Sequence, residues 1–398
     1  MKDRSFSRRS MLTRSGATVF AACSAGSLRT ARAWDALAEG DAYAPWQLWN
    51  APQLHGTPLA LVAAAVLAAN PHDTQPWLFR AREDGVDVYA DLSRNLGAMD
   101  AYVREMHLGL GCAIQNALLA AAPNGYAAEL EVMPGSLLDL AERHRPVHAA
   151  TIHLARQPAT FPDSLYRAIP ERHTNRYAYD RERPLPRDWR EFATHADVSD
   201  DVRVFLFDAG APRRVFDSTV MEATESIIAD AAMIADSDRW IRTSSDEIEK
   251  HRDGPTLEAA GLSSFTLLMA RWLPVTPAMS HQAWHDQTRD TQLATAPLVG
   301  LIAVRDRYDR QSAIAAGRTW QRLHLSATVQ GIAMQPLNQP IEMIDRERQT
   351  GRGRGWAARL AQLTGNDWQA TFSFRVGYPS QVAPASPRRR LGDVVLPA

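Results

Sequence analysis

The stretch Asn70-Pro71-His72-Asp73-Thr74-Gln75-Pro76-Trp77 decides the fold that this chain is expected to adopt. It follows an alanine-rich apolar run, 58–69, which is predicted to be a helix with Pro58 in its first turn. Pro71 ends that helix, because proline lacks a backbone N–H and clashes with the preceding turn. A short polar loop remains before two predicted strands, 77–80 and 86–91. Polar side chains on a rigid turn between packed elements suit the recognition of a flat ring with polar edges.

The composition is that of a globular protein without a strong charge bias. The chain has 398 residues, enough for two ordinary domains or one elaborate domain, with 45% apolar and 22% charged residues. A net charge of −1 argues against a general nucleic-acid partner. After the N-terminus no apolar run is long enough to form a stable membrane span.

Cofactor and metal motifs of several common classes are missing from the sequence. The two cysteines, Cys23 and Cys112, exclude a cysteine-rich zinc site, and the histidines lack metal-ligand spacing, so no metal is expected. There is no Gly-x-Ser-x-Gly elbow, no Walker-type loop and no Gly-x-Gly-x-x-Gly after a strand. A nicotinamide, if it donates hydride, would therefore bind without a Rossmann domain.

Residues 1–33 are predicted to be a targeting segment outside the fold. Ser7-Arg8-Arg9-Ser10-Met11-Leu12 resembles a twin-arginine translocation motif, an apolar run follows, and Ala31-Arg32-Ala33 offers a small-x-small cleavage site. We therefore expect export by the twin-arginine machinery to the periplasm or cell exterior. A disordered basic tail and lipidation at Cys23 are the alternatives. Residues 34–56 are expected to form a lead-in segment.

Further along the chain, two long helices and several strands are predicted. The helices span 101–122, with Gly109 and Gly111 inside the pattern, and 315–333. The remaining predicted strands are 128–132, 149–154 and 371–378.

The polar loop resembles that of the nitroreductase-like FMN-binding superfamily, which usually ends in Gln-Pro-Trp. The nearest resemblance is to its single-chain branch with two halves, which includes the mycobacterial Acg-type proteins. There the loop commonly reads Asn-Pro-His-Asn-Thr-Gln-Pro-Trp, so Asp73 stands where an Asn is expected. An ionised Asp cannot donate a hydrogen bond as Asn does, so Asp73 could replace a donor to the flavin by a negative charge.

Two further segments carry the same resemblance. Arg172-His173-Thr174-Asn175-Arg176 resembles the turn that contacts the flavin phosphate and pyrimidine edge in the superfamily, and its arginines could serve a phosphate or carbonyl oxygens. Near the C-terminus, Arg388 and Arg389 are the phosphate candidates. A solvated basic turn and a solvated basic tail are the bland alternatives. The expected FMN-binding residues are His72, Asp73, Thr74, Gln75, Arg172, His173, Thr174, Arg176, Arg388 and Arg389.

The helix predicted at 315–333 resembles a late helix of the superfamily, matching at Gly317, Arg322, Leu323, Leu325, Ala327 and Gly331. The resemblance implies an α+β fold of the nitroreductase type. Two related halves, 57–160 and 161–398, would form within one chain the interface that two subunits usually make. A long connection, 236–290, is expected to act as a lid over the flavin.

The function implied by the resemblance is that of an exported FMN-dependent oxidoreductase. Hydride would pass through the flavin from NAD(P)H or another donor to a quinone-like, nitroaromatic or other conjugated acceptor. No protein acid or base is obligatory for such chemistry, so no catalytic residue is assigned. The alternative is a storage or sequestering protein that shields its FMN and turns over little or not at all.

Overall fold

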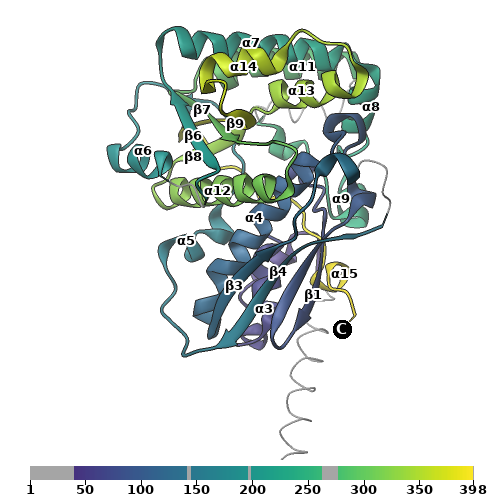
Figure 1. The fold of residues 1–398 in the computed structure, drawn as a ribbon, viewed down its shortest axis with the longest axis vertical. Helices are drawn as coiled ribbons and strands as arrows, with labels where there is room; N and C mark the ends of the chain where they lie inside the picture. Colours follow the sequence, from purple (N-terminus) through teal and green to yellow (C-terminus); the bar gives the residue numbers. More distant parts are fainter. Residues whose placement is uncertain (1–39, 141–144, 196–198, 262–276, 398) are drawn as a thin grey trace, which may run out of the picture.

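The computed structural model describes residues 40–140, 145–195, 199–261 and 277–397 (Figure 1). The predicted targeting segment, 1–33, and the first residues of the lead-in therefore lie outside the described residues. The fold is α+β, as expected, with two antiparallel sheets and helices packed on them. In Figure 1 the sheets occupy the lower and upper parts of the molecule, with helices α4 and α12 between them.

The lower sheet has four strands in the order β1-β2-β4-β3. They are β1 (Trp77–Arg82), β2 (Gly85–Ala90), β3 (Tyr126–Val132) and β4 (Val147–Arg156). Helices α3 (Pro58–Ala65) and α4 (Arg104–Ala121) pack against this sheet and against each other. All eight residues of α3 are apolar and Leu59–Ala65 are buried, so tertiary packing rather than an amphipathic stripe holds this helix.

The upper sheet has the order β5-β9-β7-β6, and β8 also pairs with β9. Its strands are β5 (Tyr179–Asp180), β6 (Val202–Phe207), β7 (Leu298–Val304), β8 (Ala333–Pro336) and β9 (Gln369–Pro379). Every residue of β7 is buried. Leu298 and Ile302 join the core around α12, whereas Val299 and Leu301 join a second core on the opposite face. A strand covered on both faces reads as a continuous apolar run, which is what its sequence shows.

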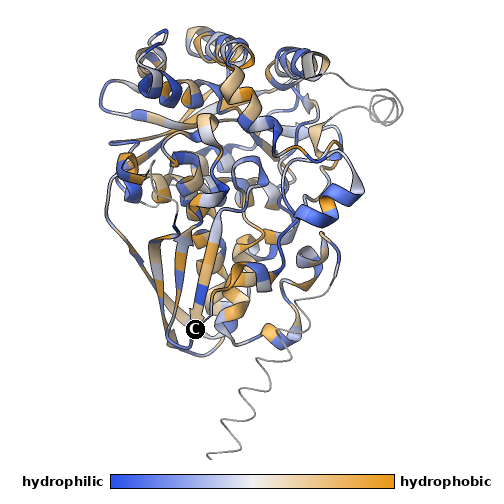
Figure 2. Cartoon of the chain, turned by 90° about the vertical axis from the view of Figure 1, so that its right-hand side faces the viewer, coloured by the Kyte–Doolittle hydropathy of each residue, from blue (hydrophilic) through white to orange (hydrophobic). Residues whose placement is uncertain are grey.

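Helices cover both faces of the upper sheet. Helix α12 (Arg310–Val329) lies on the face toward the lower sheet, and α7 (Gly210–Ile228), α13 (Gln339–Thr350) and α14 (Trp356–Thr364) lie on the other (Figure 1). The outer helices mix hydrophilic and hydrophobic residues, as surface helices do (Figure 2). The shorter helices are α2 (Ala44–Leu48), α5 (Ser164–Arg167), α6 (Arg187–Thr194), α8 (Ala231–Asp238), α9 (Ser245–His251), α11 (Pro277–Gln287) and α15 (Leu391–Val394). Among the described residues, no helix combines the length and apolarity needed to cross a membrane.

Helices α4 and α12 join the two sheets through a close crossing that requires glycine on both sides. A Cβ at Gly111 would lie 2.2 Å from the Ile314 carbonyl oxygen, and one at Gly317 would lie 2.0 Å from the Leu108 carbonyl oxygen. Polar contacts reinforce the crossing, because Gln321 Nε2 donates to Asn116 Oδ1 over 2.8 Å. Each sheet therefore carries one long helix of the crossing, an arrangement compatible with the two predicted halves, whose boundary stays a prediction.

Three of the predicted helices have different ends in the structure. The helix predicted over 58–69 ends at Ala65, before Pro71, because the chain leaves the helix after the C-cap residue Val66. Helix α4 begins at Arg104 rather than 101, because Asp100 accepts hydrogen bonds from the backbone N–H of Glu105 and Met106. The prediction of a helix over 315–333 was wrong at both ends. Asp309 caps α12 through the Ser312 N–H, and at the other end Gly331 has a φ of +68°, after which β8 pairs with β9.

Candidate functional site

The polar loop that follows α3 is held in a strained conformation. His72, Asp73 and Gln75 have φ values of +45°, +47° and +48°, a region that residues with a Cβ rarely occupy. Asn70 stabilises the turn, because its Oδ1 accepts from the Gln75 N–H over 2.7 Å and its Nδ2 donates to Asp73 over 3.2 Å. Such strain persists only where the surroundings enforce it, and it gathers at functional sites.

Gln75 and Thr74 connect the loop to the rest of the molecule. The buried Gln75 side chain accepts from the Arg389 N–H over 2.7 Å and donates to the Arg252 carbonyl over 2.8 Å. The Thr74 carbonyl accepts from Arg94, while its buried hydroxyl has no hydrogen-bond partner among the described residues. In this structure Gln75 and Thr74 therefore attach the loop to the segments packed behind it.

Asp73 forms a buried ion pair with Arg388. The Arg388 side chain is 2% exposed, and it also donates to Ser386 Oγ over 2.8 Å and stacks 4.8 Å from the Trp46 ring centre. Burial raises the pKa of Asp73 to about 6, against the opposite pull of Arg388. The second carboxylate oxygen of Asp73 has no hydrogen-bond partner among the described residues.

Arg172 brings a second buried positive charge next to Arg388. It donates to the Leu67 carbonyl over 3.1 Å, its Nε has no partner among the described residues, and no described carboxylate pairs with it. Burial, and then repulsion by Arg388, lowers the pKa of Arg172 to about 10. His173 packs edge-on against Trp46, and burial lowers the pKa of its imidazole to about 3. One carboxylate, Asp73, thus faces two buried guanidinium groups.

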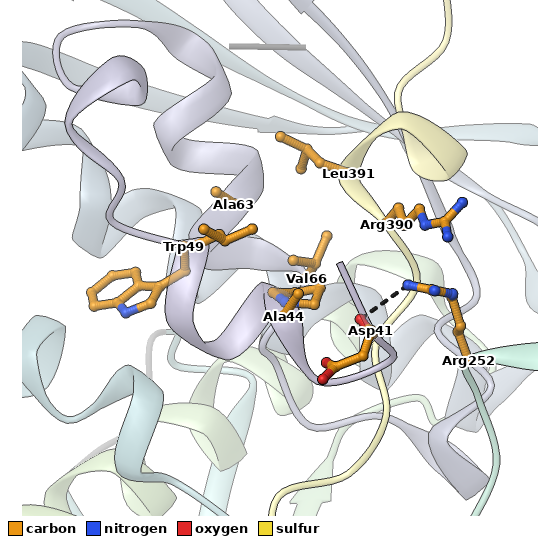
Figure 3. A pocket seen from close by; sticks show the side chains of 10 residues that line it. Asp41, Ala44, Trp49, Ala63, Val66, Arg252, Arg390 and Leu391 are labelled. Atoms are coloured by element: carbon orange, nitrogen blue, oxygen red, sulfur yellow. Dashed lines mark hydrogen bonds between the residues drawn. The ribbon is translucent and has the colours of Figure 1, made fainter. Parts of the chain in front are cut away.

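Arg389 lies behind the loop with its guanidinium on backbone carbonyls. It donates to the Gln75 carbonyl over 3.2 Å and to the Asp393 carbonyl over 2.7 Å. Nearby, Arg252 and Arg390 line a small pocket of about 20 Å³ beside the lead-in, where Arg252 donates to the Asp41 carbonyl over 3.0 Å (Figure 3). Of the two predicted phosphate arginines, Arg388 is the one beside Arg172.

A cavity of about 390 Å³ lies beside the polar loop, a volume suited to a cofactor or small ligand. Residues of the polar loop, of α4 and of the 172–176 turn line it, together with residues of the upper sheet and its helices. Of the predicted site residues, His72, Thr174 and Arg176 line the cavity. The others, Asp73, Thr74, Gln75, Arg172, His173, Arg388 and Arg389, are absent from the lining and pack around it.

The segment 236–290 closes one side of the cavity over its described residues. Ser237 lies 3.0 Å from His72 Nε2, and the Ala259 carbonyl accepts from Arg176 over 3.1 Å. Trp284 and Gln287 of α11 also line the cavity. Burial, and then the positive charge of Arg176, lowers the pKa of His72 to about 4. The imidazole is therefore neutral at pH 7. The predicted lid thus contributes wall residues, and its motion stays a prediction.

The cavity lining also includes two glutamates that the sequence did not single out. Glu105, in the first turn of α4, and Glu342 of α13 are 5% and 6% exposed, and both line the cavity. Asn338 Nδ2 donates to Glu105 over 2.9 Å. The two carboxyl groups come from segments far apart in the chain, and neither has a local motif that could have revealed it. Within the described residues, no group of three or more His, Cys, Asp or Glu side chains could hold a metal ion.

Comparisons with known proteins identify a curated homologue and solved structures that align with part of the chain. No protein-family model matches the chain. A Mycobacterium tuberculosis protein, found in two strains under the name "Putative NAD(P)H nitroreductase", is 26% identical over 343 residues, which is 84% of this chain and 90% of the relative. The chain is homologous to that protein.

Solved nitroreductases align with about three-fifths of the chain. A nitroreductase with bound FMN from Desulfitobacterium hafniense is 12% identical, with 60% of this chain and 100% of that chain covered and a TM-score of 0.35. The FMN-dependent nitroreductase NfnB of Mycobacterium smegmatis, in complex with NADPH, is 17% identical, with 59% and 93% covered and a TM-score of 0.32. Both TM-scores are below 0.5, and they add nothing to the fold described above.

Proposed function

We propose that this chain is an FMN-dependent oxidoreductase of the nitroreductase type, and that its FMN binds in the cavity between the two sheets. The homologue of Mycobacterium tuberculosis, whose name gives an NAD(P)H nitroreductase activity, supports the reaction class. The match between the polar loop and the superfamily loop supports the cofactor. Bound FMN supplies hydride transfer between an electron donor and a conjugated acceptor.

The observation that carries the proposal is the surplus of buried positive charge beside the cavity. Arg172 and Arg388 donate to the carbonyls of Leu67 and Ala68, directly before the loop residues that line the cavity. The Nε atoms of both guanidinium groups lack partners among the described residues. Leaving buried donors unsatisfied costs about 1–3 kcal/mol each, so an anionic group that accepts from them would be favoured. A flavin phosphate fits this chemistry.

The remaining residues would position the ring and exclude water. His72, Thr174 and Arg176 present polar atoms to the cavity, while Leu108, Trp320 and Phe372 supply apolar lining. The wall formed by Ser237, Ala259 and Trp284 covers the same space. A mostly apolar site, once a ligand fills it, keeps water from the reacting atoms and strengthens every charge interaction inside it.

The direct test is anaerobic addition of NADPH to the purified protein while its visible spectrum is recorded. A reductase should show flavin bands that bleach within seconds and return when a quinone is added. Bands that persist after NADPH, and that dithionite bleaches, would contradict nicotinamide-driven reduction.

The second candidate function is an FMN-binding protein with a shielded flavin and little turnover. The wall contributed by segment 236–290 favours it, since Ser237 and Ala259 contact residues on the rest of the cavity rim. The charge of Asp73 supports a shielded flavin less strongly than this wall does, because Asp73 is paired with Arg388 and does not line the cavity. Slow bleaching by dithionite as well as by NADPH would select this function.

We further propose that the protein is exported by the twin-arginine pathway, on the strength of Arg8, Arg9 and the Ala31-Arg32-Ala33 site. Folded export would let FMN be inserted in the cytoplasm before transport. Cell fractionation tests this proposal with the double variant Arg8→Lys/Arg9→Lys. The wild type should be recovered outside the cytoplasm and the variant inside it; equal distributions would contradict export by this route.

A further inference from the structure

One part of the cavity wall holds more carboxyl groups than the nearby cations can pair. Asp100, Glu105, Glu342 and Asp345 are all buried, and they surround one buried guanidinium group, that of Arg104. Arg104 donates to Asp345 over 2.8 Å with both side chains at 0% exposure. Its contact with Glu105 is longer, at 3.4 Å. Arg104 therefore pairs mainly with Asp345.

The two aspartates have their hydrogen bonds within the protein. Asp100 accepts from the N–H groups of Glu105 and Met106, and Asp345 accepts from Arg104 and from the Tyr308 hydroxyl over 2.9 Å. Arg307, the other cation near Asp345, donates to Gln369 over 3.2 Å rather than to a glutamate. Neither aspartate lines the cavity.

The two glutamates, by contrast, face the cavity with few or no partners. Asn338 is fixed by the Ser373 N–H, which donates to its Oδ1 over 2.9 Å, so its Nδ2 is the group that donates to Glu105. Glu342 is 6% exposed and lines the cavity, and its carboxyl group forms no hydrogen bond with a described residue. A buried carboxyl group without a partner is costly, and a ligand that donates hydrogen bonds would remove that cost.

Neighbouring side chains add further acceptors to the same cavity. The buried Oε1 atoms of Gln292 and Gln339 lack partners among the described residues, and both side chains line the cavity. Apolar lining of the cavity comes from residues such as Met99, Leu108 and Phe372. The wall is thus an apolar surface with unfilled hydrogen-bond acceptors and a surplus of carboxyl groups.

We infer that Glu105 and Glu342 form a binding subsite for an organic cation, namely a protonated amine attached to an apolar or aromatic group. An ammonium group supplies three donors and a positive charge, which matches unfilled acceptors in an acidic wall. The inference rests on the proposed function, because it names amine-bearing compounds as a substrate class for the same cavity.

The subsite should release a proton when the cation binds. Burial, and then Asp100 and Asp345, raises the pKa of Glu105 to about 8 against the pull of Arg104. Burial and the nearby Glu105 raise the pKa of Glu342 as well. At pH 7 the pair therefore holds at least one proton in the empty cavity. An entering ammonium group favours the ionised carboxylates, so that proton leaves to the buffer.

Calorimetric titration of the purified holoprotein with benzylamine tests the subsite, with benzyl alcohol as the neutral probe of similar shape. At pH 7 benzylamine should bind at least about tenfold more tightly, the effect of one buried charge-assisted hydrogen bond. Titrations in two buffers of different ionisation enthalpy should show up to one proton released per benzylamine bound. Equal affinities, or binding without proton release, would overturn the inference.

Variants assign the effect to the wall. Glu342→Gln keeps the shape but removes the ionisable carboxyl group. It should reduce the preference for benzylamine about tenfold and the proton release severalfold. Glu129→Gln, on an exposed position of β3, is the matched control and should leave both unchanged. A visible spectrum of each sample separates the two proposals. Flavin bands without amine preference would refute the subsite alone, whereas a colourless protein would refute the cofactor.

Discussion

The two ends of the cavity differ in which buried groups lack a partner. At one end two buried arginines, Arg172 and Arg388, face one carboxylate; at the other, two glutamates face a guanidinium group already paired with Asp345. Both imbalances lie along α4, since Glu105 is in its first turn and Cys112, an electrostatic neighbour of Arg172, is about two turns further on.

This difference teaches that each end leaves groups that a bound ligand could pair: the Nε atoms of Arg172 and Arg388 at one end and the carboxyl group of Glu342 at the other. Buried charges in proteins are normally paired, because an unpaired charge loses its hydration without compensation. An anion at the arginine end and a hydrogen-bond donor at the glutamate end would complete both. The variants below test whether the two ends are independent and which contacts hold them in place.

Breaking the arginine end should have the largest effect on stability. Arg388→Met leaves Asp73 buried without its counter-charge, which should lower the free energy of unfolding by about 3–5 kcal/mol at pH 8. The loss should shrink at pH 5, because a protonated Asp73 needs no counter-charge. Urea unfolding at the two pH values measures it.

The double variant Asp73→Asn/Arg388→Met separates stability from FMN binding. It should recover most of the lost stability, since no buried charge is left alone, yet it should still bind FMN at least about tenfold more weakly. Recovery of FMN affinity together with stability would show that Arg388 serves only the fold.

At the glutamate end, stability should depend on pH through Glu105. Its folded pKa of about 8 lies above the ordinary value of 4.5, so its contribution is fully present below 4.5 and is lost as the pH rises through about 8. The slope is at most about 1.4 kcal/mol per pH unit for one proton. Glu105→Gln should therefore flatten the decline of the unfolding temperature between pH 5 and 8. A decline as steep as that of the wild type would contradict the assignment; Glu129→Gln is the control.

A smaller effect on stability is expected from a substitution where α4 and α12 cross. This contact fixes the position of one sheet relative to the other. Gly317→Ala would place a methyl group against the Leu108 carbonyl and should cost about 1–3 kcal/mol. Gly392→Ala, where no atom lies within 4 Å of the added Cβ, is the control. Equal thermal unfolding of the two variants would show that the helices can separate freely.

The smallest effect concerns the contact between the loop and the covering segment. Ser237→Ala removes the hydrogen bond with His72 and should cost about 0.5–1.5 kcal/mol. Ser218→Ala, at an exposed position of α7, is the control. If both variants unfold alike and release FMN at the wild-type rate, the covering segment does not depend on this contact.

The sequence predicted the parts of the fold that have local signals. Pro58 and Pro71 bracket the helix and its exit, and alternating apolar residues marked β1, β2, β4 and β9. The bounds of α12 were missed because its start depends on capping by Asp309 and its end on the pairing of β8 with β9. The polar loop was found, but its left-handed backbone is imposed by Asn70 and by distant contacts.

The site was harder to predict, because its decisive pairs join residues far apart in the chain. Asp73 and Arg388 are separated by 315 positions, and Glu105 and its partner Asn338 by 233. No periodicity or spacing links such residues. The sequence predicted Asp73 as a flavin contact, which stays a prediction, whereas its pairing with Arg388 and its absence from the cavity lining came only from the structure. Glu105 and Glu342 come together only because α13 packs near the start of α4, which the sequence does not reveal.

The most direct test of the central claim is the visible absorption spectrum of the purified, folded protein before and after incubation with FMN and removal of the excess. We predict flavin bands that remain with the wild type and are weaker or absent with Asp73→Asn/Arg388→Met, which should keep most of the stability. A wild type that stays colourless after incubation with FMN would contradict it.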